Sequence, residues 1–144
     1  MVEKNIALLN QYKYVVIYGE NDGIKGDIKK KIKKNNQNSE IITLFQEEIL
    51  RNENILSEQI NNSSLFSSKK IIFLHEINDK AFKQILECLE NKNEDIKIYI
   101  FSQILEKKSK LRSHFEKDQK LGIIPCYQDN ERTLMNYIKL ELKD

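Results

Sequence analysis

The segment from residue 19 to residue 26 follows an apolar run and has the length of a phosphate-binding loop. A working loop follows the pattern G-x-x-x-x-G-K-[ST], in which backbone amides surround the phosphates, the lysine contacts the terminal phosphates and the hydroxyl binds magnesium. Gly19 and Lys25 occupy the first glycine and the lysine positions. Ile24 replaces the second glycine, and Gly26 replaces the hydroxyl residue. We therefore interpret Gly19 and Lys25 as remnants of a nucleotide loop.

Charge and a second strand end also argue against nucleotide chemistry. Glu20 and Asp22 put negative charge where a polyphosphate would lie. The apolar run that ends at His75 resembles a strand with a magnesium-binding carboxylate, but a histidine stands where the aspartate is expected. A lone histidine is a weak catalytic signal, so we expect His75 to be a hydrogen-bonded residue at a strand end. We predict no catalytic residue, no metal, no cofactor and no ATP hydrolysis. The alternative is an active P-loop enzyme that depends on Lys25.

Two large apolar residues, Leu65 and Phe66, stand side by side with polar residues before and after them. Successive side chains of a strand point to opposite faces, so the two cannot both face the core from a regular strand. The surrounding serines and asparagines favour turns and helix caps, which predicts a junction of helix and loop. The pair is then either a local core under that loop or an apolar wedge that binds a partner.

Short apolar runs alternate with helical patterns along the chain. The runs that predict strands are residues 14–18, 40–45, 70–75, 96–101 and a short one within 122–127. The helical patterns cover residues 23–34, 46–60 with a break near residue 51, 79–89, 109–115 and a last segment from residue 129. For the first helix we expect Asp22 as the N-cap. This alternation predicts a three-layer α/β fold with a five-stranded, mostly parallel sheet.

Composition sets limits on the class of protein. With 144 residues, 40% hydrophobic and 32% charged, the chain is expected to form one domain with a core of its own. No apolar run approaches the length of a membrane span, and the start lacks an apolar signal core. Cys88 and Cys126 show no metal-ligand spacing and are expected to be buried thiols in a reducing cytosol. We expect a cytoplasmic protein without membrane contact.

The net charge of +2 does not by itself indicate nucleic-acid binding. The lysines between Lys29 and Lys34 form a basic helix face, and a second basic cluster spans residues 107–112. No aromatic residues alternate with the lysines of that helix, so the sequence gives no support for base stacking. A DNA-binding module that uses Lys29 to Lys34 stays open as a second alternative.

Four segments occur in a fixed order along the chain. They read YVVIYGE at residues 14–20, SLFSSKKII at residues 64–72, IYIF at residues 98–101 and KKSKL at residues 107–111. Cys126-Tyr127 and a terminal helical pattern follow them. In this order the segments resemble the N-terminal domain of the delta subunit of the bacterial DNA polymerase III clamp loader. SLFSSK before a strand is the most specific part of the resemblance, which covers nearly the whole chain.

The resemblance implies an AAA+-type fold without a working ATP site. It implies a non-catalytic subunit of the DNA polymerase III holoenzyme that binds the sliding clamp (the beta subunit) and helps to open the ring during DNA replication. The family protein is longer and has two further domains that join the other clamp-loader subunits. We therefore expect this chain to be a piece of a three-domain subunit, with DNA as a partner only in the assembled loader.

The resemblance also implies where the clamp binds. Leu65 and Phe66 are expected to enter an apolar pocket on the clamp, and neighbouring helix residues are expected to form a polar rim. Ser63 stands where the family often has a larger apolar residue, which predicts a smaller anchor. The expected clamp-binding residues are Leu65, Phe66, Ser63, Ser64, Gln59 and Asn62.

Overall fold

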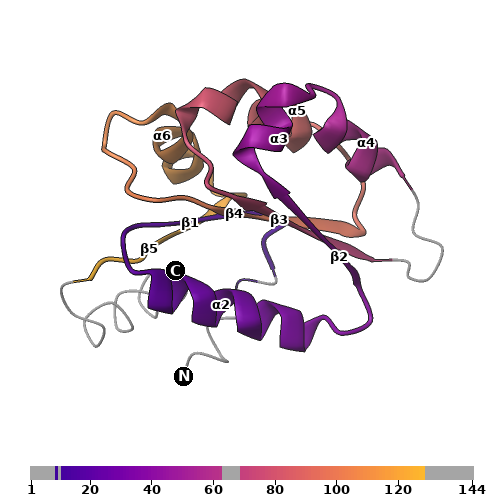
Figure 1. The fold of residues 1–144 in the computed structure, drawn as a ribbon, viewed down its shortest axis with the longest axis horizontal. Coiled ribbons are helices and arrows are strands. Elements are labelled where there is room, and N and C mark those ends of the chain that lie inside the picture. Colours follow the sequence, from indigo (N-terminus) through magenta and orange to yellow (C-terminus); the bar gives the residue numbers. More distant parts are fainter. Residues whose placement is uncertain (1–8, 10, 63–68, 129–144) are drawn as a thin grey trace.

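The computed structural model describes residue 9, residues 11–62 and residues 69–128 (Figure 1). Its five strands are β1 (Tyr14–Tyr18), β2 (Glu40–Phe45), β3 (Lys70–His75), β4 (Ile96–Phe101) and β5 (Gly122–Pro125). They form one sheet in the order β2-β3-β4-β1-β5, and every pairing within it is parallel. The predicted α/β class is confirmed, and the sheet is parallel throughout rather than mostly parallel.

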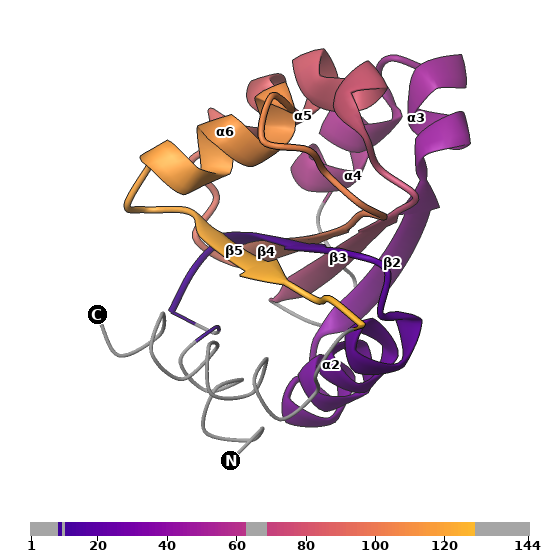
Figure 2. The ribbon, with the colours of Figure 1, turned by 90° about the vertical axis from the view of Figure 1, so that its left-hand side faces the viewer.

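Helices cover both faces of this sheet. They are α2 (Asp22–Asn35), α3 (Gln46–Arg51), α4 (Ile55–Asn61), the 3₁₀ helix η1 (Asp79–Ala81), α5 (Phe82–Leu89) and α6 (Lys110–Lys117). Figures 1 and 2 show α2 on one face, and α3, α4, α5 and α6 together on the other. No helix in the described part of the chain is long and apolar enough to cross a membrane.

The handedness of the crossovers explains why α2 lies apart from the other helices. The connection from β1 to β2 runs along the sheet in one direction, whereas those from β2 to β3, β3 to β4 and β4 to β5 run in the other. A crossover between parallel strands is almost always right-handed. Reversing the direction therefore puts the connecting helix on the opposite face, so α2 covers one face and the later helices cover the other.

Two apolar clusters fill the space between these layers. Ile24, Ile28 and Ile32 of α2 pack on the face of the sheet that contains Phe73 and Tyr99. The other cluster lies on the opposite face of the sheet, where buried residues of the strands pack against α3, α4, α5 and α6. The strand β4 directs Ile96, Ile98 and Ile100 to one face and Tyr99 and Phe101 to the other.

Helix boundaries follow their caps. The expectation that Asp22 caps the first helix is wrong: the side chain of Asn21 accepts from the Ile24 amide at 3.0 Å, and Asp22 is the first helical residue. The break predicted near residue 51 separates α3 from α4. The side chain of Ser109 caps α6 by accepting from the Arg112 amide at 3.2 Å. The last helical pattern, from residue 129, lies outside the described residues.

Both cysteines are buried free thiols, as the sequence predicts. Burial raises the pKa of Cys88 and of Cys126 to about 12. Both groups are therefore neutral thiols at physiological pH, and they serve as small apolar side chains.

The end of β1 depends on a glycine. Gly19 has a φ of +124°, and a Cβ at this position would lie 2.0 Å from the carbonyl oxygen of Cys126. The amide of Cys126 in turn donates to Tyr18 O at 2.6 Å, so the backbone cannot move away without losing the pairing of β1 with β5. Only a residue without a side chain fits this approach.

We predict that Gly19→Ala lowers the free energy of unfolding by about 3 kcal/mol or more, from the clash and the strained φ together. Gly26→Ala is the matched control, because a Cβ at Gly26 meets no atom within 4 Å. That change should stabilise the protein by about 0.5–1 kcal/mol, as helical glycines do when replaced. Urea denaturation measures both, and a Gly19→Ala variant as stable as the wild type would contradict the prediction.

Candidate functional site

A ligand site in this sheet is expected at the carboxyl ends of β1 and β4. These strands are neighbours, and the chain leaves them toward opposite sides of the sheet. Open parallel sheets bind ligands in the crevice at such a topological switch point. Here the segments after the two strands are joined directly: Gly19 N–H donates to Gln103 O at 3.0 Å, and Ser102 N–H donates to Ile17 O at 2.9 Å.

The backbone amides of the loop after β1 are engaged in bonds within the protein. Asn21 N–H donates to Cys126 O and Asp22 N–H donates to Glu20 O, each at 3.0 Å. The amide of Ile24 is taken by the Asn21 side chain. A phosphate-binding loop needs several of these amides directed at the ligand. In this conformation Gly19, Asn21, Asp22 and Ile24 have no amide left for that purpose.

Lys25, the lysine of the expected nucleotide loop, is buried with only 7% of its surface exposed. Its ammonium donates to the carbonyl oxygen of Ser102 at 3.0 Å and lies 3.2 Å from a carboxylate oxygen of Asp22. A buried cation must be hydrogen-bonded or paired, and these two groups meet that requirement. Lys25 therefore ties the first turns of α2 to the end of β4.

His75 ends β3 in a stack of rings. Its ring lies 5.0 Å from that of Phe101 at an angle of 11°, and 5.4 Å from that of Phe45 at 31°. The Nε2 atom lies 2.7 Å from the ammonium of Lys29, which confirms a hydrogen-bonded histidine. Burial, and then the charges of Lys29, Lys33 and Lys25, lower the pKa of His75 to about 4. The neutral ring accordingly accepts the hydrogen bond from Lys29.

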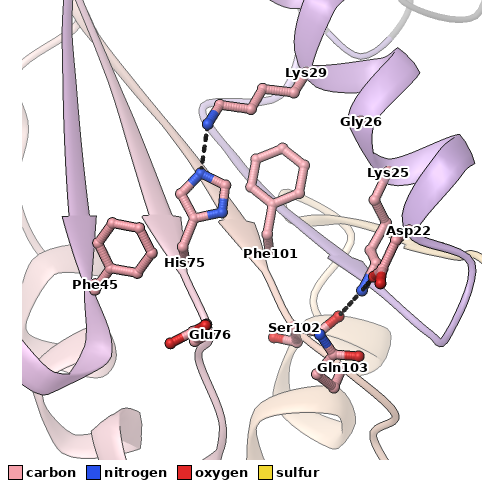
Figure 3. Close-up of a pocket in the computed structure, with 10 residues that line it drawn as sticks. All are labelled: Asp22, Lys25, Gly26, Lys29, Phe45, His75, Glu76, Phe101, Ser102 and Gln103. Atoms are coloured by element: carbon pink, nitrogen blue, oxygen red, sulfur yellow. Dashed lines mark hydrogen bonds and ion pairs between the residues drawn. The ribbon is translucent and has the colours of Figure 1, made fainter.

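These groups line a pocket of about 260 Å³ between the first turns of α2 and the ends of β2, β3 and β4. Figure 3 shows Lys29 reaching the imidazole from α2, with Phe45 and Phe101 on either side of it. Lys25 and Asp22 lie together beside Ser102 and Gln103. Two lysines and one paired carboxylate give the α2 side of the pocket a positive character.

No group of three or more metal-ligating side chains was found in the described ranges. The strand end that would hold a magnesium carboxylate carries His75, whose Nε2 is engaged by Lys29. The next residue, Glu76, is exposed and has a φ of +58°.

A second lysine fixes the segment before the apolar pair. Lys70, at the start of β3, is 5% exposed, and its ammonium donates to Gln59 O at 2.6 Å and to Asn62 O at 2.8 Å. These are carbonyls of the last turn and the C-cap of α4, where a cation is favoured by the helix dipole. Lys70 thereby holds together the two segments that come directly before and after residues 63–68.

The expected clamp-binding residues divide between two parts of the chain. Gln59 is half-buried in the last turn of α4, and Asn62 is exposed at its C-cap. Ser63, Ser64, Leu65 and Phe66 lie outside the described residues. The choice between a wedge and a local core for Leu65 and Phe66 therefore stays a prediction.

A scan against protein-family models finds no match for this chain, and a search of curated proteins finds none either.

Three contributors to these sites were missed by sequence reasoning. Phe45 reads as the last apolar residue of a strand, yet 42% of its surface is exposed. Lys70 reads as a solvated residue before a strand, and Ser102 as a loop serine. Ser102 is almost fully buried, and its Oγ has no partner among the described residues. The only signal in the sequence was the position of Ser102 directly after a strand, at the edge where ligands bind.

We predict that Lys25 has a structural role. Lys25→Met keeps the aliphatic stem but leaves the Ser102 carbonyl and Asp22 without their cation, which should lower the free energy of unfolding by about 1–3 kcal/mol. Lys30→Met, on the exposed side of the same helix, should change it by less than about 0.5 kcal/mol. Denaturant titration compares the two variants. Equal stability together with lost ATP turnover would instead assign Lys25 to catalysis.

The depressed pKa of His75 predicts a pH dependence of stability. Between the ordinary value of 6.5 and the folded value of about 4, the unfolded chain binds a proton that the folded chain does not. The contribution is therefore fully present above pH 6.5 and is lost as the pH falls toward 4. His75→Gln keeps an acceptor for Lys29 and removes the titration, so its stability should fall less steeply across this window. Parallel curves from pH-dependent urea unfolding would contradict the assignment.

Proposed function

We propose that this chain is a non-catalytic, AAA+-like domain of a clamp-loader subunit that binds a sliding clamp through Leu65 and Phe66. The observation that carries the proposal is the Lys70 ammonium, which holds the end of α4 against the start of β3. A rigid base on both sides of a six-residue segment lowers the entropy lost when that segment binds a partner.

The fold is consistent with this proposal. In the order β2-β3-β4-β1-β5, the strand β4 lies between β3 and β1, unlike the doubly wound orders 3-2-1-4-5-6 and 2-1-3-4-5. The five parallel strands between two layers of helices fit the AAA+-like fold of the proposal. The closed loop after β1 and the internal bonds of Lys25 support the non-catalytic part of the proposal.

The mechanism rests on differential affinity. A sliding clamp is a closed ring, and a protein that binds the open ring better than the closed one shifts the equilibrium by that difference and no further. Leu65 and Phe66 would each contribute roughly 1.5–3 kcal/mol when buried in a pocket, as interface hot spots do. Gln59 and Asn62 would form the polar rim. Other loader subunits and DNA would join through domains beyond this chain.

We predict that Leu65→Ala with Phe66→Ala weakens clamp binding on the order of a hundredfold or more, because both anchors are lost. The melting temperature should be unchanged, since the pair lies outside the core in this proposal. The matched control is Leu50→Ala with Ile104→Ala, which removes two other apolar side chains that are 40% and 60% exposed. Surface plasmon resonance on immobilised clamp measures the affinities.

Two outcomes would contradict this proposal. A large drop in the melting temperature of the Leu65/Phe66 variant would assign the pair to a local core. Equal loss of binding in the control variant would show that general surface apolarity, rather than this pair, carries the interaction.

A further inference from the structure

The face of the sheet that α2 covers is left open at its edge strand. On this face β2 presents Ile41, Thr43 and Phe45, and all three are exposed. Ile41 is 37% and Phe45 is 42% exposed, which is high for large apolar residues of a strand. The remaining residues of β2 point to the opposite face, where Leu44 is buried among the other helices. A strip of about 13 Å along β2 is therefore open to solvent and partly apolar.

A row of lysines from α2 lies beside this strip. Lys29 and Lys33 are one helical turn apart, and their ammonium groups lie 5.2 and 6.0 Å from the centre of the Phe73 ring in β3. Neither lysine has a carboxylate partner among the described residues. Burial, and then the charge of Lys33, lower the pKa of Lys29. Both ammonium groups thus lie near one ring with no paired carboxylate in the described ranges, which favours binding of an anion.

The ring stack provides the second element. Phe101, His75 and Phe45 follow one another at centroid distances of 5.0 and 5.4 Å, and the stack ends in the exposed ring of Phe45. Figure 3 shows this sequence of rings beside Lys29. A planar base placed on Phe45 would extend the stack, while its backbone could follow the lysines. The tertiary structure thus brings the ring of Phe45 next to the basic face of α2, a helix that has no aromatic residue of its own.

We propose that Lys29, Lys33 and Phe45 form a binding surface for single-stranded nucleic acid, with phosphates on the two lysines and a base on the phenyl ring. Basic grooves that follow the backbone, combined with aromatic platforms for the bases, are the general solution for single-strand binding. An acidic peptide would use the lysines but would gain little from Phe45. A duplex would present its phosphates but keeps its bases inside the stack.

Among the described residues, the carboxylates near this surface do not pair with its two lysines. Glu48 Oε1, the one beside Phe45, accepts from the Phe45 amide at 3.1 Å. Asp22 is paired with Lys25 at the far side of the pocket. Glu40 lies at the start of β2, and strand alternation directs it to the opposite face. Glu76 lies beyond the end of β3 and is exposed to solvent. The surface uses none of the expected clamp-binding residues, so the two proposals can fail separately.

The test measures fluorescence anisotropy of a labelled oligothymidylate with the 144-residue chain, beside a duplex of the same length and polyglutamate as a competitor. Lys29→Gln with Lys33→Gln should weaken oligothymidylate binding on the order of tenfold or more. The same change should lower the salt slope by about 1.4, or about 0.7 for each phosphate that is no longer neutralised. Glutamine keeps a donor for His75. Lys30→Gln with Lys34→Gln makes the same change of charge elsewhere on α2 and should change affinity far less.

Phe45→Leu separates stacking from charge. It keeps an apolar side chain at the end of β2 and removes the ring, and it should weaken oligothymidylate binding by about tenfold without changing the salt slope. Thermal melting of each variant checks that the fold is kept. Clamp binding should be unchanged in all of them, and the Leu65/Phe66 variant should bind the oligonucleotide as the wild type does.

Several results would overturn the inference. These are an absence of oligothymidylate binding, equal affinity for the duplex, displacement by polyglutamate at equal charge concentration, and equal losses in the two lysine pairs. Binding that Phe45→Leu leaves unchanged would overturn the stacking role and reduce the surface to a general polyanion site.

Discussion

A buried ammonium group at the end of β4 determines what the carboxyl edge of this sheet can do. Lys25 reaches across the switch point between β1 and β4 and donates to Ser102 O, with Asp22 as its counterion. Removing a cation from water is costly unless its hydrogen bonds are replaced. The Ser102 carbonyl and the Asp22 carboxylate replace them here and stabilise the buried ammonium. A phosphate at the same place would have to compete with both the carbonyl and the carboxylate.

The surrounding backbone fits the same arrangement. Gly19 lets the chain pass against Cys126 O at a distance that no side chain would permit, and the next amides bond to β5 and to the loop itself. The loop after β1, Lys25 and the ends of β4 and β5 depend on one another, because each provides hydrogen-bond partners for polar groups that the others bury. At this edge, where parallel sheets usually bind ligands, the polar groups of the loop after β1 are largely engaged with one another.

Lysines serve the fold in a second way at β3. Lys70 is nearly buried, and its charge lies at the carboxyl end of α4, where unpaired carbonyls and the helix dipole favour a cation. Lys29 and Lys33 differ from Lys25 and Lys70, because they meet aromatic rings and a neutral histidine instead of carbonyls. Two lysines thus hold elements together, and two others place positive charge on one face of the described part of the sheet.

The sequence alone determined the α/β class, the five strands and the apolar faces of the helices, because hydrophobic periodicity reports local geometry directly. The departures of Ile24 and Gly26 from the phosphate-loop pattern were also readable, since they depend on residue type at fixed spacing. It did not determine the strand order, the cap at Asn21 or the internal role of Lys25, which depend on the crossover direction and on backbone atoms distant in sequence. The exposure of Phe45 beside Lys29 was likewise decided only by tertiary structure. A helix and an edge strand that follow one another in the chain meet there because α2 covers only part of its face of the sheet.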